Sequence, residues 1–269
     1  MKIGKKHIVL CGSAAASLLV SGVLAVVSSV LAGSLQSQRA AERWADGGDV
    51  PYAQVSVFSG SDAALYEGSV DSLRESVTNA LKQAAMEQQK DGPRLWYDAY
   101  STHGNDLIMK GTKRGSVTAE ITAVGGDFFM MHPLQLVDGS YIGKDDLMQD
   151  RLVIDERLAW DLFGSSQVSG MTIDISGKHC PVAGVVRLEQ DSASRKVASD
   201  APQAFMSYTL YNSLTGSDSS YGDYYGDYGS SAGITCYEIV MPDLVRGYAK
   251  MQVTDALGEP SDMYILQNT

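Results

Sequence analysis

The residues best suited to metal binding or nucleophilic chemistry are four histidines and three cysteines, and they are dispersed along the chain. Structural zinc sites need histidine and cysteine ligands at short, characteristic spacings. None of these histidines stands at such a spacing with a cysteine or a carboxylate; they are His7, His103, His132 and His179. His179 and Cys180 are adjacent, but neighbouring side chains on a strand point to opposite faces. The sequence therefore predicts no metal ligands.

The segment 138–145 comes nearest to a phosphate-binding loop. Its glycines, Gly139 and Gly143, are one residue too close for that motif, and Asp145 replaces the hydroxyl that holds magnesium. Asp145 and Asp146 fit a solvated loop better than a catalytic pair. No Gly-x-Ser-x-Gly elbow occurs in the sequence either. We therefore predict a protein that is not an enzyme, with no catalytic or cofactor-binding residues and no cofactor.

Residues 215–233 consist almost entirely of Gly, Ser, Tyr and Asp. Such a segment buries too little apolar area to order itself, so we expect a disordered, exposed loop. Asp218, Asp223 and Asp227 lack the order of a calcium loop and its terminal glutamate, so calcium is not expected there. The tyrosines leave a docking role open, because tyrosine is enriched where proteins meet.

The most hydrophobic segment, 8–31, contains no charged residue and follows three lysines within residues 1–6. A helix of this length can cross a bilayer core of about 30 Å. The positive-inside rule then places the N-terminus in the cytoplasm and the bulk of the chain outside. The alternative is a signal peptide cleaved after Ala32, but signal peptides have shorter apolar regions of about 7–15 residues. An uncleaved single-pass anchor is therefore expected.

The part of the chain beyond the anchor is acidic. The formal net charge is −11 for the whole chain and near −14 without the three N-terminal lysines. This charge argues against nucleic acid and against a polybasic lipid-binding surface. Outside the cell, Cys180 and Cys236 could form one disulfide, and two buried free thiols are the alternative. Cys11 lies within the apolar segment.

The first half of the outer part predicts a strand, a helix and three further strands. Residues 52–58 alternate enough for a strand. Apolar residues recur at helical spacing over 70–84, with Ser72 and Glu75 as a capping box near the start. An Asp-Gly-Pro breaker at 91–93 should end this helix. Further strands are expected at 94–100, 107–110 and 116–124.

The middle of the chain has the clearest local pattern. Residues 152–154 predict a short strand, and Asp155 can cap the helix that follows. The buried face of that helix should carry Leu158, Ala159, Leu162 and Phe163. Gly164 can end it in a left-handed turn. A hairpin should follow, with strands at 171–175 and 180–186 and its turn at Ser176-Gly177.

The C-terminal part repeats the strand–helix–strand order of the opening. Asp243 can cap a helix that runs to Leu257. Strands are expected at 204–208, 234–241 and 263–266.

A family pattern emerges from several segments taken together. The helix ending in Leu162-Phe163-Gly164 is the most specific, and a strand ending in Gly184-Val185-Val186 follows it. The other segments are 121–129, 136–141, 152–161 and 171–175. Together they resemble the periplasmic core domain of MacB-type ABC-transporter permeases.

The resemblance implies an α+β fold, in which one N-terminal transmembrane helix precedes a two-lobed extracytoplasmic α/β domain. A porter-like strand–helix–strand lobe would carry a smaller inserted α/β lobe. The expected divisions are a cytoplasmic tail (1–6), a transmembrane helix (7–32), a connector (33–50), the porter-like lobe (51–125 and 200–269) and the inserted lobe (126–199).

The resemblance also implies a non-catalytic permease component, which docks partners or transmits ATP-driven motion in export or cell-envelope processes. Its implied partners are the membrane, an ABC ATPase subunit, and further permease segments or a second permease copy, with no nucleic acid. The family has four membrane helices, and this chain has no apolar span after the first. We therefore expect the N-terminal part of such a permease: a fragment, a truncated gene or one piece of a split subunit. The alternatives are a single-span anchored binding or sensor protein without an ATPase, and a secreted enzyme.

Overall fold

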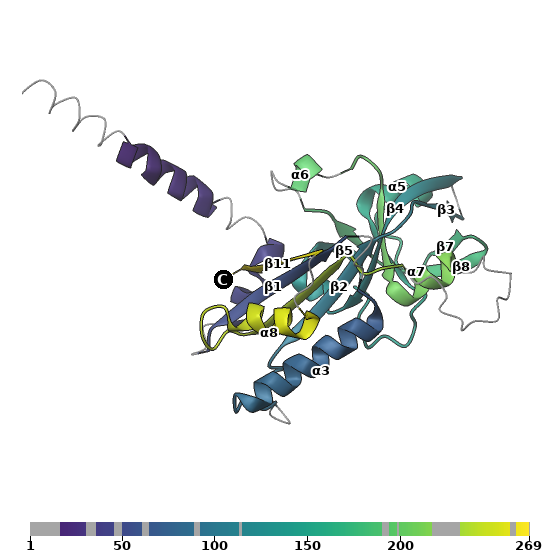
Figure 1. The fold of residues 1–269 in the computed structure, drawn as a ribbon. Coiled ribbons are helices and arrows are strands. Elements are labelled where there is room, and N and C mark those ends of the chain that lie inside the picture. Colours follow the sequence, from purple (N-terminus) through teal and green to yellow (C-terminus); the bar gives the residue numbers. More distant parts are fainter. Residues whose placement is uncertain are drawn as a thin grey trace, which may run out of the picture.

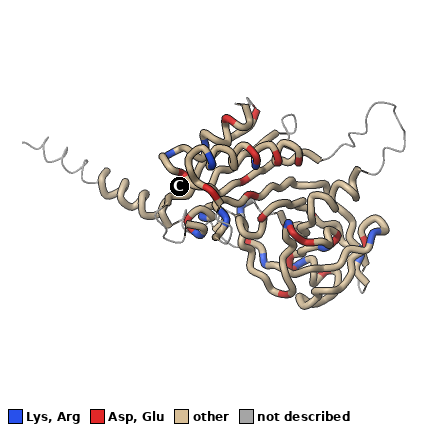
Figure 2. The backbone as a smooth tube through the Cα atoms, turned by 90° about the horizontal axis from the view of Figure 1, so that it is seen from below, with Lys and Arg blue, Asp and Glu red and all other residues tan. Residues whose placement is uncertain are grey.

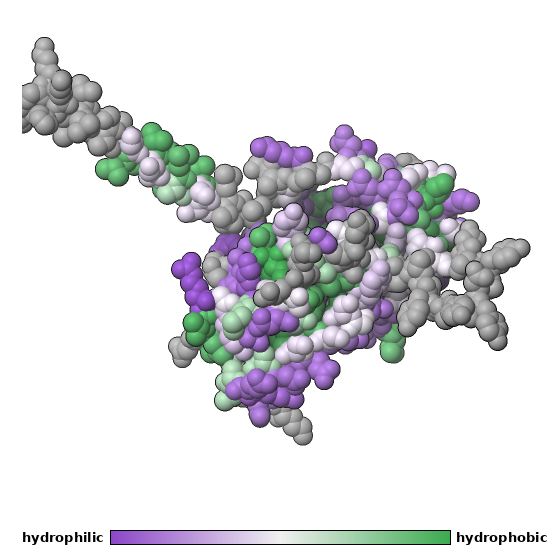
Figure 3. All heavy atoms as spheres, viewed as in Figure 1, coloured by the Kyte–Doolittle hydropathy of each residue, from purple (hydrophilic) through white to green (hydrophobic). Residues whose placement is uncertain are grey.

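The structure, a computed structural model, describes most of the chain (Figure 1). The described residues are 17–30, 36–45, 50–60, 65–88, 92–112, 115–189, 194–197, 199–216, 232–258 and 262–268. Most of the low-complexity loop, with its three aspartates, lies outside these ranges, and so do residues 8–16 of the apolar segment. Residues 17–30 form a helix whose apolar side chains are exposed (Figure 3). Among the described residues, no helix is both long enough and apolar enough to cross a membrane.

The eleven strands of the described chain belong to one continuous sheet with the order β11-β1-β10-β2-β4-β3-β7-β8-β6-β9, and β5 pairs with β8. The strands are β1 (Tyr52–Ser59), β2 (Tyr97–His103), β3 (Leu107–Gly111), β4 (Ser116–Gly126), β5 (Gln135–Gly139), β6 (Leu152–Asp155), β7 (Thr172–Ile175), β8 (Lys178–Arg187), β9 (Gln203–Ser207), β10 (Cys236–Pro242) and β11 (Met263–Asn268). The helices are η1 (Gln36–Arg39), α2 (Ala40–Ala45), α3 (Glu67–Gln83), α4 (Phe128–Met131), α5 (Glu156–Phe163), α6 (Ser194–Val197), α7 (Tyr208–Thr215) and α8 (Tyr248–Leu257). This mixed α+β fold confirms the expected class.

One end of the sheet is an antiparallel flank of four strands, β11-β1-β10-β2. Helices α3 and α8 lie side by side on one of its faces (Figure 1). They bury apolar side chains there because those residues recur on one side of each helix. The opposite face carries α2, which contacts β1 and β10. The flank is therefore the middle layer between two helical layers.

The other end of the sheet closes into a ring of six strands. Strand β4 pairs with β3, and the pairing continues through β7, β8 and β6 to β9. Strand β9 then pairs in parallel with β4, which closes the ring. Helix α5 contacts β3, β4, β6, β8 and β9, so its apolar face lies against the ring. The ring combines strands from both expected lobes: β3, β4 and β9 from the porter-like lobe, and β6, β7 and β8 from the inserted lobe. The division into two lobes stays a prediction.

Local signals in the middle of the chain are confirmed. The Asp155 carboxylate accepts a hydrogen bond from the Leu158 amide at 2.7 Å, which is the expected cap. Gly164 ends α5 in the left-handed region with a φ of 72°. Leu162 and Phe163 are buried, and Ser176-Gly177 turns the hairpin with positive φ at both residues.

Several local predictions were wrong, among them Asp243 as the cap of α8, because that helix begins at Tyr248 with Gly247 as its N-cap. The Ser72 and Glu75 capping box does not exist, because α3 begins at Glu67, and the Ser72 hydroxyl donates to the Gly68 carbonyl instead. Strand β2 begins at Tyr97, three residues later than predicted. The expected strand at 204–208 ends one residue early, where Ser207 caps the unpredicted helix α7 by accepting from the Leu210 amide.

Candidate functional site

Two polar regions stand out within the described chain. The first, the connector junction, holds the connector segment (36–45, comprising η1 and α2) against the flank. The second, the cleft, is a cavity of about 830 Å³ between α3 and the loop that follows β5. Both regions contain several charged residues; charged residues also occur elsewhere in the domain but not in helix 17–30 (Figure 2).

Gln54 is the centre of the connector junction. Its side chain is fully buried on β1, where a polar residue needs hydrogen bonds to compensate for lost water. Its Oε1 accepts from the Ala40 amide at 3.2 Å, and its Nε2 donates to the Ser37 carbonyl at 2.9 Å. One side chain of the flank therefore binds the backbone of the connector within η1 and at the first residue of α2.

Glu238 lies beside Gln54 on the neighbouring strand β10. Its Oε1 accepts from Gln54 Nε2 and from Ser56 Oγ, both at 3.1 Å. Its Oε2 lies 2.5 Å from His132 Nε2. Burial alone would raise the pKa of Glu238, but the charge of His132 and these donors hold it below its ordinary value. The carboxylate is therefore a buried anion with a complete set of partners.

The connector also binds the C-terminal end of α4. Arg43 donates to the Met130 and Met131 carbonyls, both at 2.9 Å, at a helix end where carbonyls lack helical partners. His132 follows directly and stacks on Phe128, with ring centroids 4.5 Å apart. The contacts thus form a closed circuit, from α2 through α4, His132, Glu238 and Gln54 back to the connector.

The floor of the cleft depends on two glycines at the end of β4. A Cβ atom at Gly125 would lie 2.1 Å from the Tyr100 ring, so only glycine lets that ring lie against the strand. Gly126 has a φ of +65°, a conformation that favours glycine. The Tyr100 hydroxyl donates to Glu67 Oε1 at 3.1 Å, and burial, followed by the Glu67 charge, raises the pKa of Tyr100.

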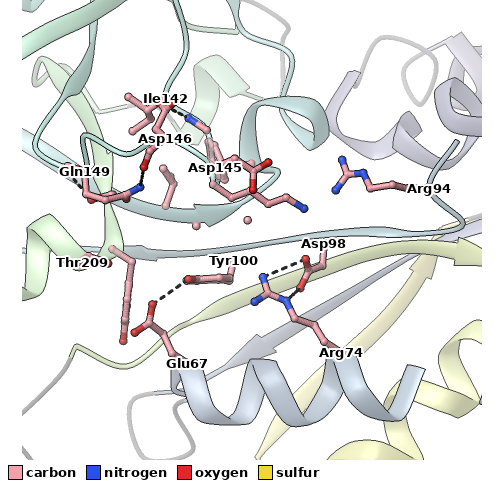
Figure 4. Close-up of a pocket in the computed structure, with 18 of the residues that line it drawn as sticks. Glu67, Arg74, Arg94, Asp98, Tyr100, Ile142, Asp145, Asp146, Gln149 and Thr209 are labelled. Carbon is pink, nitrogen blue, oxygen red and sulfur yellow. Dashed lines mark hydrogen bonds and ion pairs between the residues drawn. The ribbon is translucent and has the colours of Figure 1, made fainter. Parts of the chain in front are cut away.

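Two mostly buried carboxylates, Asp98 and Asp127, hold three cations that line the cleft; Figure 4 shows the pair of Asp98 with Arg74. Asp98 accepts from Arg74 Nε at 2.8 Å and Nη2 at 3.2 Å. Asp127 accepts from both Nη atoms of Arg94, at 2.7 and 3.1 Å, and from Lys144 Nζ at 3.1 Å. The Arg94 bonds hold the pKa of Asp127 below its ordinary value against the effect of burial. Each acid is less exposed than its cations.

The loop from 142 to 151 forms the facing wall. Asp146 accepts from the Gly143 amide at 3.0 Å and pairs with Arg151 at 2.5 Å, which folds the loop back on itself. Asp145 lines the cavity near Arg94, whose pKa its charge helps to raise. The segment that resembled a phosphate loop is a turn, as predicted, but its aspartates border the cleft.

Three of the four histidines, His103, His132 and His179, lie within the described residues. His132 lies in the connector junction, while exposed His179 is 3.3 Å from Asp174. Among the described residues, no group of three His, Cys, Asp or Glu side chains is placed to hold a metal. Cys180 and Cys236 are free thiols, which decides between the two alternatives. Burial raises the pKa of Cys180 to about 11, so this thiol is not a ready nucleophile.

Neither polar region was anticipated as a site from the sequence. A usable signal for the junction is the polar Gln54 and Glu238 inside strands that are otherwise apolar. For the cleft, the signal is the pair Gly125-Gly126 at the end of a long strand. Each signal marks a position but not its partner, because the partners lie far away in the sequence.

Comparisons with known proteins agree with the arrangement of strands and helices. The family described as the MacB-like periplasmic core domain matches residues 14–237. The crystal structure of the periplasmic region of MacB from Actinobacillus actinomycetemcomitans is similar with a TM-score of 0.50 and 16% identity, over 80% of this chain and 88% of that one. The extracellular domain of the ABC-type transporter YknZ from Gram-positive bacteria has a TM-score of 0.49 and 11% identity, over 79% and 99%. The comparison with curated proteins returns no match.

Proposed function

Since this chain belongs to the MacB-like periplasmic core domain family, the extracytoplasmic domain of ABC-transporter permeases, we propose that it transmits ATP-driven movement from a membrane permease to the outside of the cell. It acts without catalysis, by changing its position or by docking a partner during export or cell-envelope processes. No transported substrate is assigned.

The connector junction is the observation that supports this role. A segment that only joins two parts needs no buried charge, yet here a buried glutamine binds the connector backbone, and a buried glutamate accepts a hydrogen bond from that glutamine. Buried polar networks with all partners satisfied fix one arrangement of the groups that make them. A displacement of the connector would therefore move the flank with it, rather than bend the joint.

The apolar helix before the connector supports a membrane position. Leu18 and Leu19 in helix 17–30 are 75% and 72% exposed, which is unfavourable in water and natural in lipid. We place the transmembrane helix at 7–32, with the tail 1–6 in the cytoplasm and the connector at 33–50 outside. Protease added to wall-stripped cells should then digest the domain and leave a membrane-bound stub. A soluble mature protein that begins at Gly33 would contradict this topology.

The proposed partners are an ABC ATPase subunit and either further permease segments or a second permease copy. The domain would divide into a porter-like lobe (51–125 and 200–269) and an inserted lobe (126–199). ATP hydrolysis on the cytoplasmic side supplies the energy, so the outer domain itself needs no cofactor.

Hydrogen exchange in the native assembly tests the proposal. The tagged full chain is purified from its source membranes in mild detergent, and amide exchange of 36–45 is compared with ATP and with ADP. We expect an ATP-hydrolysing protein to co-purify, and the exchange of 36–45 to differ between the nucleotides. Gln54→Leu should remove that difference, whereas Gln167→Leu, at an exposed position, should keep it. Purification without an ATPase would favour the anchored binding protein instead, a function that the cleft would suit.

A further inference from the structure

The cleft has the size and the lining of a ligand site. Its volume of about 830 Å³ falls within the range of about 300–1,000 Å³ usual for small-molecule pockets. We propose that the cleft binds a carboxylate monoanion carried on an aromatic or apolar body, with the carboxylate at Arg94 and Lys144. This inference goes beyond the transmission of motion, since it requires no ATPase.

The cations of the cleft are held in position before any ligand arrives. Side-chain exposure is 39% for Arg94 and 35% for Lys144, against 10% for Asp127, the acid that they share. Both cations therefore face the cavity while their common carboxylate lies behind them. Cations oriented by buried carboxylates are preorganised, so binding costs little further side-chain ordering.

Spare donors remain on both cations. An ammonium group has three N–H donors, and Lys144 uses one of them on Asp127. The Arg94 guanidinium has five: its bonds to Asp127 use one on each Nη, and Nη2 also donates to Met130 Sδ at 3.6 Å, which leaves one on Nη1 and one on Nε. The remaining donors lie close together because both groups bind the same carboxylate. These donors can bind a planar carboxylate placed between the two cations, by donating to its oxygens.

The local charge favours a monoanion over a dianion. Arg94 and Lys144 bring two positive charges to the single negative charge of Asp127. Asp145 lines the same cavity, and its charge already acts on Arg94. Asp146 is taken up by Arg151, and Glu67 accepts from Tyr100 toward the opposite end of the cleft from Arg94 (Figure 4). Arg94, Lys144 and Asp127 carry one net positive charge, and Asp145 brings the sum to zero, so this cluster suits a carboxylate monoanion better than a phosphate dianion.

The rest of the cavity suits the body of such a ligand. A carboxylate alone would fill a small part of the volume. The remaining lining includes the aromatic side chains of Trp96, Tyr100 and Phe128, together with Val124. Aromatic faces gain stacking energy in addition to burial of their area. A flat apolar group could therefore extend from the cations across the floor formed by Gly125 and Tyr100.

A binding titration of the full chain in neutral detergent tests the proposal through tryptophan fluorescence, since Trp96 lines the cleft. The probes are 3-phenylpropanoate, its neutral amide, and inorganic phosphate. We expect the carboxylate to bind about fivefold more tightly than the amide, as a partly exposed ion pair allows. Equal affinities would overturn the anion site, and tighter binding of phosphate would overturn the carboxylate assignment.

Three variants locate the binding. Lys144→Gln keeps the Arg94–Asp127 pair and should remove the preference for the carboxylate. Lys178→Gln, at an exposed lysine on β8 that donates to Ser213, should keep it. Asp145→Asn should strengthen binding of the carboxylate and leave the amide unchanged. An unchanged preference in Lys144→Gln, or unchanged carboxylate affinity in Asp145→Asn, would place the anion elsewhere and overturn the proposal. Thermal melting of each variant shows whether the fold is intact.

Discussion

The connector junction and the cleft both pair carboxylates with hydrogen-bond donors and cations, but these groups are more deeply buried in the junction than in the cleft. In the junction, Glu238 is 4% exposed, and its carboxylate oxygens contact the side chains of Gln54, Ser56 and His132. In the cleft, the side chains of Asp98 and Asp127 are 3% and 10% exposed, whereas the cations that they hold are 31% to 39% exposed. Buried charges are costly to leave without a partner, whereas exposed pairs contribute little. The junction is therefore suited to fixing a position, and the cleft is suited to exchanging partners with a ligand.

Phe163→Ala, in the helix that packs against the ring of strands, should cause the largest loss of stability. The side chain is buried on the face of α5 that meets the ring. The substitution should lower the free energy of unfolding by about 3–5 kcal/mol. Urea denaturation of the full chain measures this loss. A loss below about 1 kcal/mol would mean that neighbouring side chains fill the space left by the phenyl group.

Glu238→Ala should be the most damaging change in either polar region. It leaves Gln54, Ser56 and His132 without their shared acceptor, and breaking a buried pair costs about 3 kcal/mol or more. The same urea titration measures the loss. Glu42→Ala, at an exposed pair with Arg39 in the connector, is the control and should change stability by about 0.5 kcal/mol or less. Equal losses would erase the distinction between buried and exposed pairs.

Acid should weaken the junction. Because the pKa of Glu238 is lowered by folding, its contribution to stability is complete above the unfolded value of about 4.3 and is lost as the pH falls through the lower folded value. Glu238→Gln removes this titration. The stability of the wild type should therefore fall more steeply below about pH 4.3 than that of the variant. If the stability of the wild type and of Glu238→Gln depended on pH in the same way, Glu238 would have the same pKa in the folded and the unfolded state.

Lys144→Gln should have a much smaller effect on stability than Glu238→Ala. Lys144 is one of two cations on Asp127 and is partly exposed, so its loss should cost about 1 kcal/mol or less. A thermal melt of the full chain measures this change. A loss as large as that of Glu238→Ala would mean that the cleft is structural and not free to exchange partners.

The sequence predicted those parts of the fold that depend on neighbouring residues. The cap at Asp155, the stop at Gly164 and the turn at Ser176-Gly177 each act within a few residues, and each is confirmed. The Ser72 capping box failed although its spacing was correct, because Leu65 pairs with Ile234 and the helix begins soon afterwards. A distant contact thus decided the start of α3.

The two polar regions could not be predicted in the same way. Gln54 and Glu238 are 184 residues apart, and they meet because Ser56 stands opposite Glu238 in the register of β1 and β10. Asp127 pairs with Arg94, which precedes it in the sequence, and with Lys144, which follows it. A hydrophobic pattern indicates which face of a strand is buried, but it does not indicate which strand lies beside it.

The parallel pairing of β4 with β9 has a consequence for how the chain reaches its native state. Ile121 pairs with Ala204, so the ring cannot close until the chain has been synthesised well past its middle. Until then, β4 has an open edge, and such edges invite pairing with other chains. Contacts so distant in sequence slow folding, because the intervening chain must lose its freedom first. We therefore expect refolding to be limited by ring closure, and aggregation during refolding to increase steeply with protein concentration.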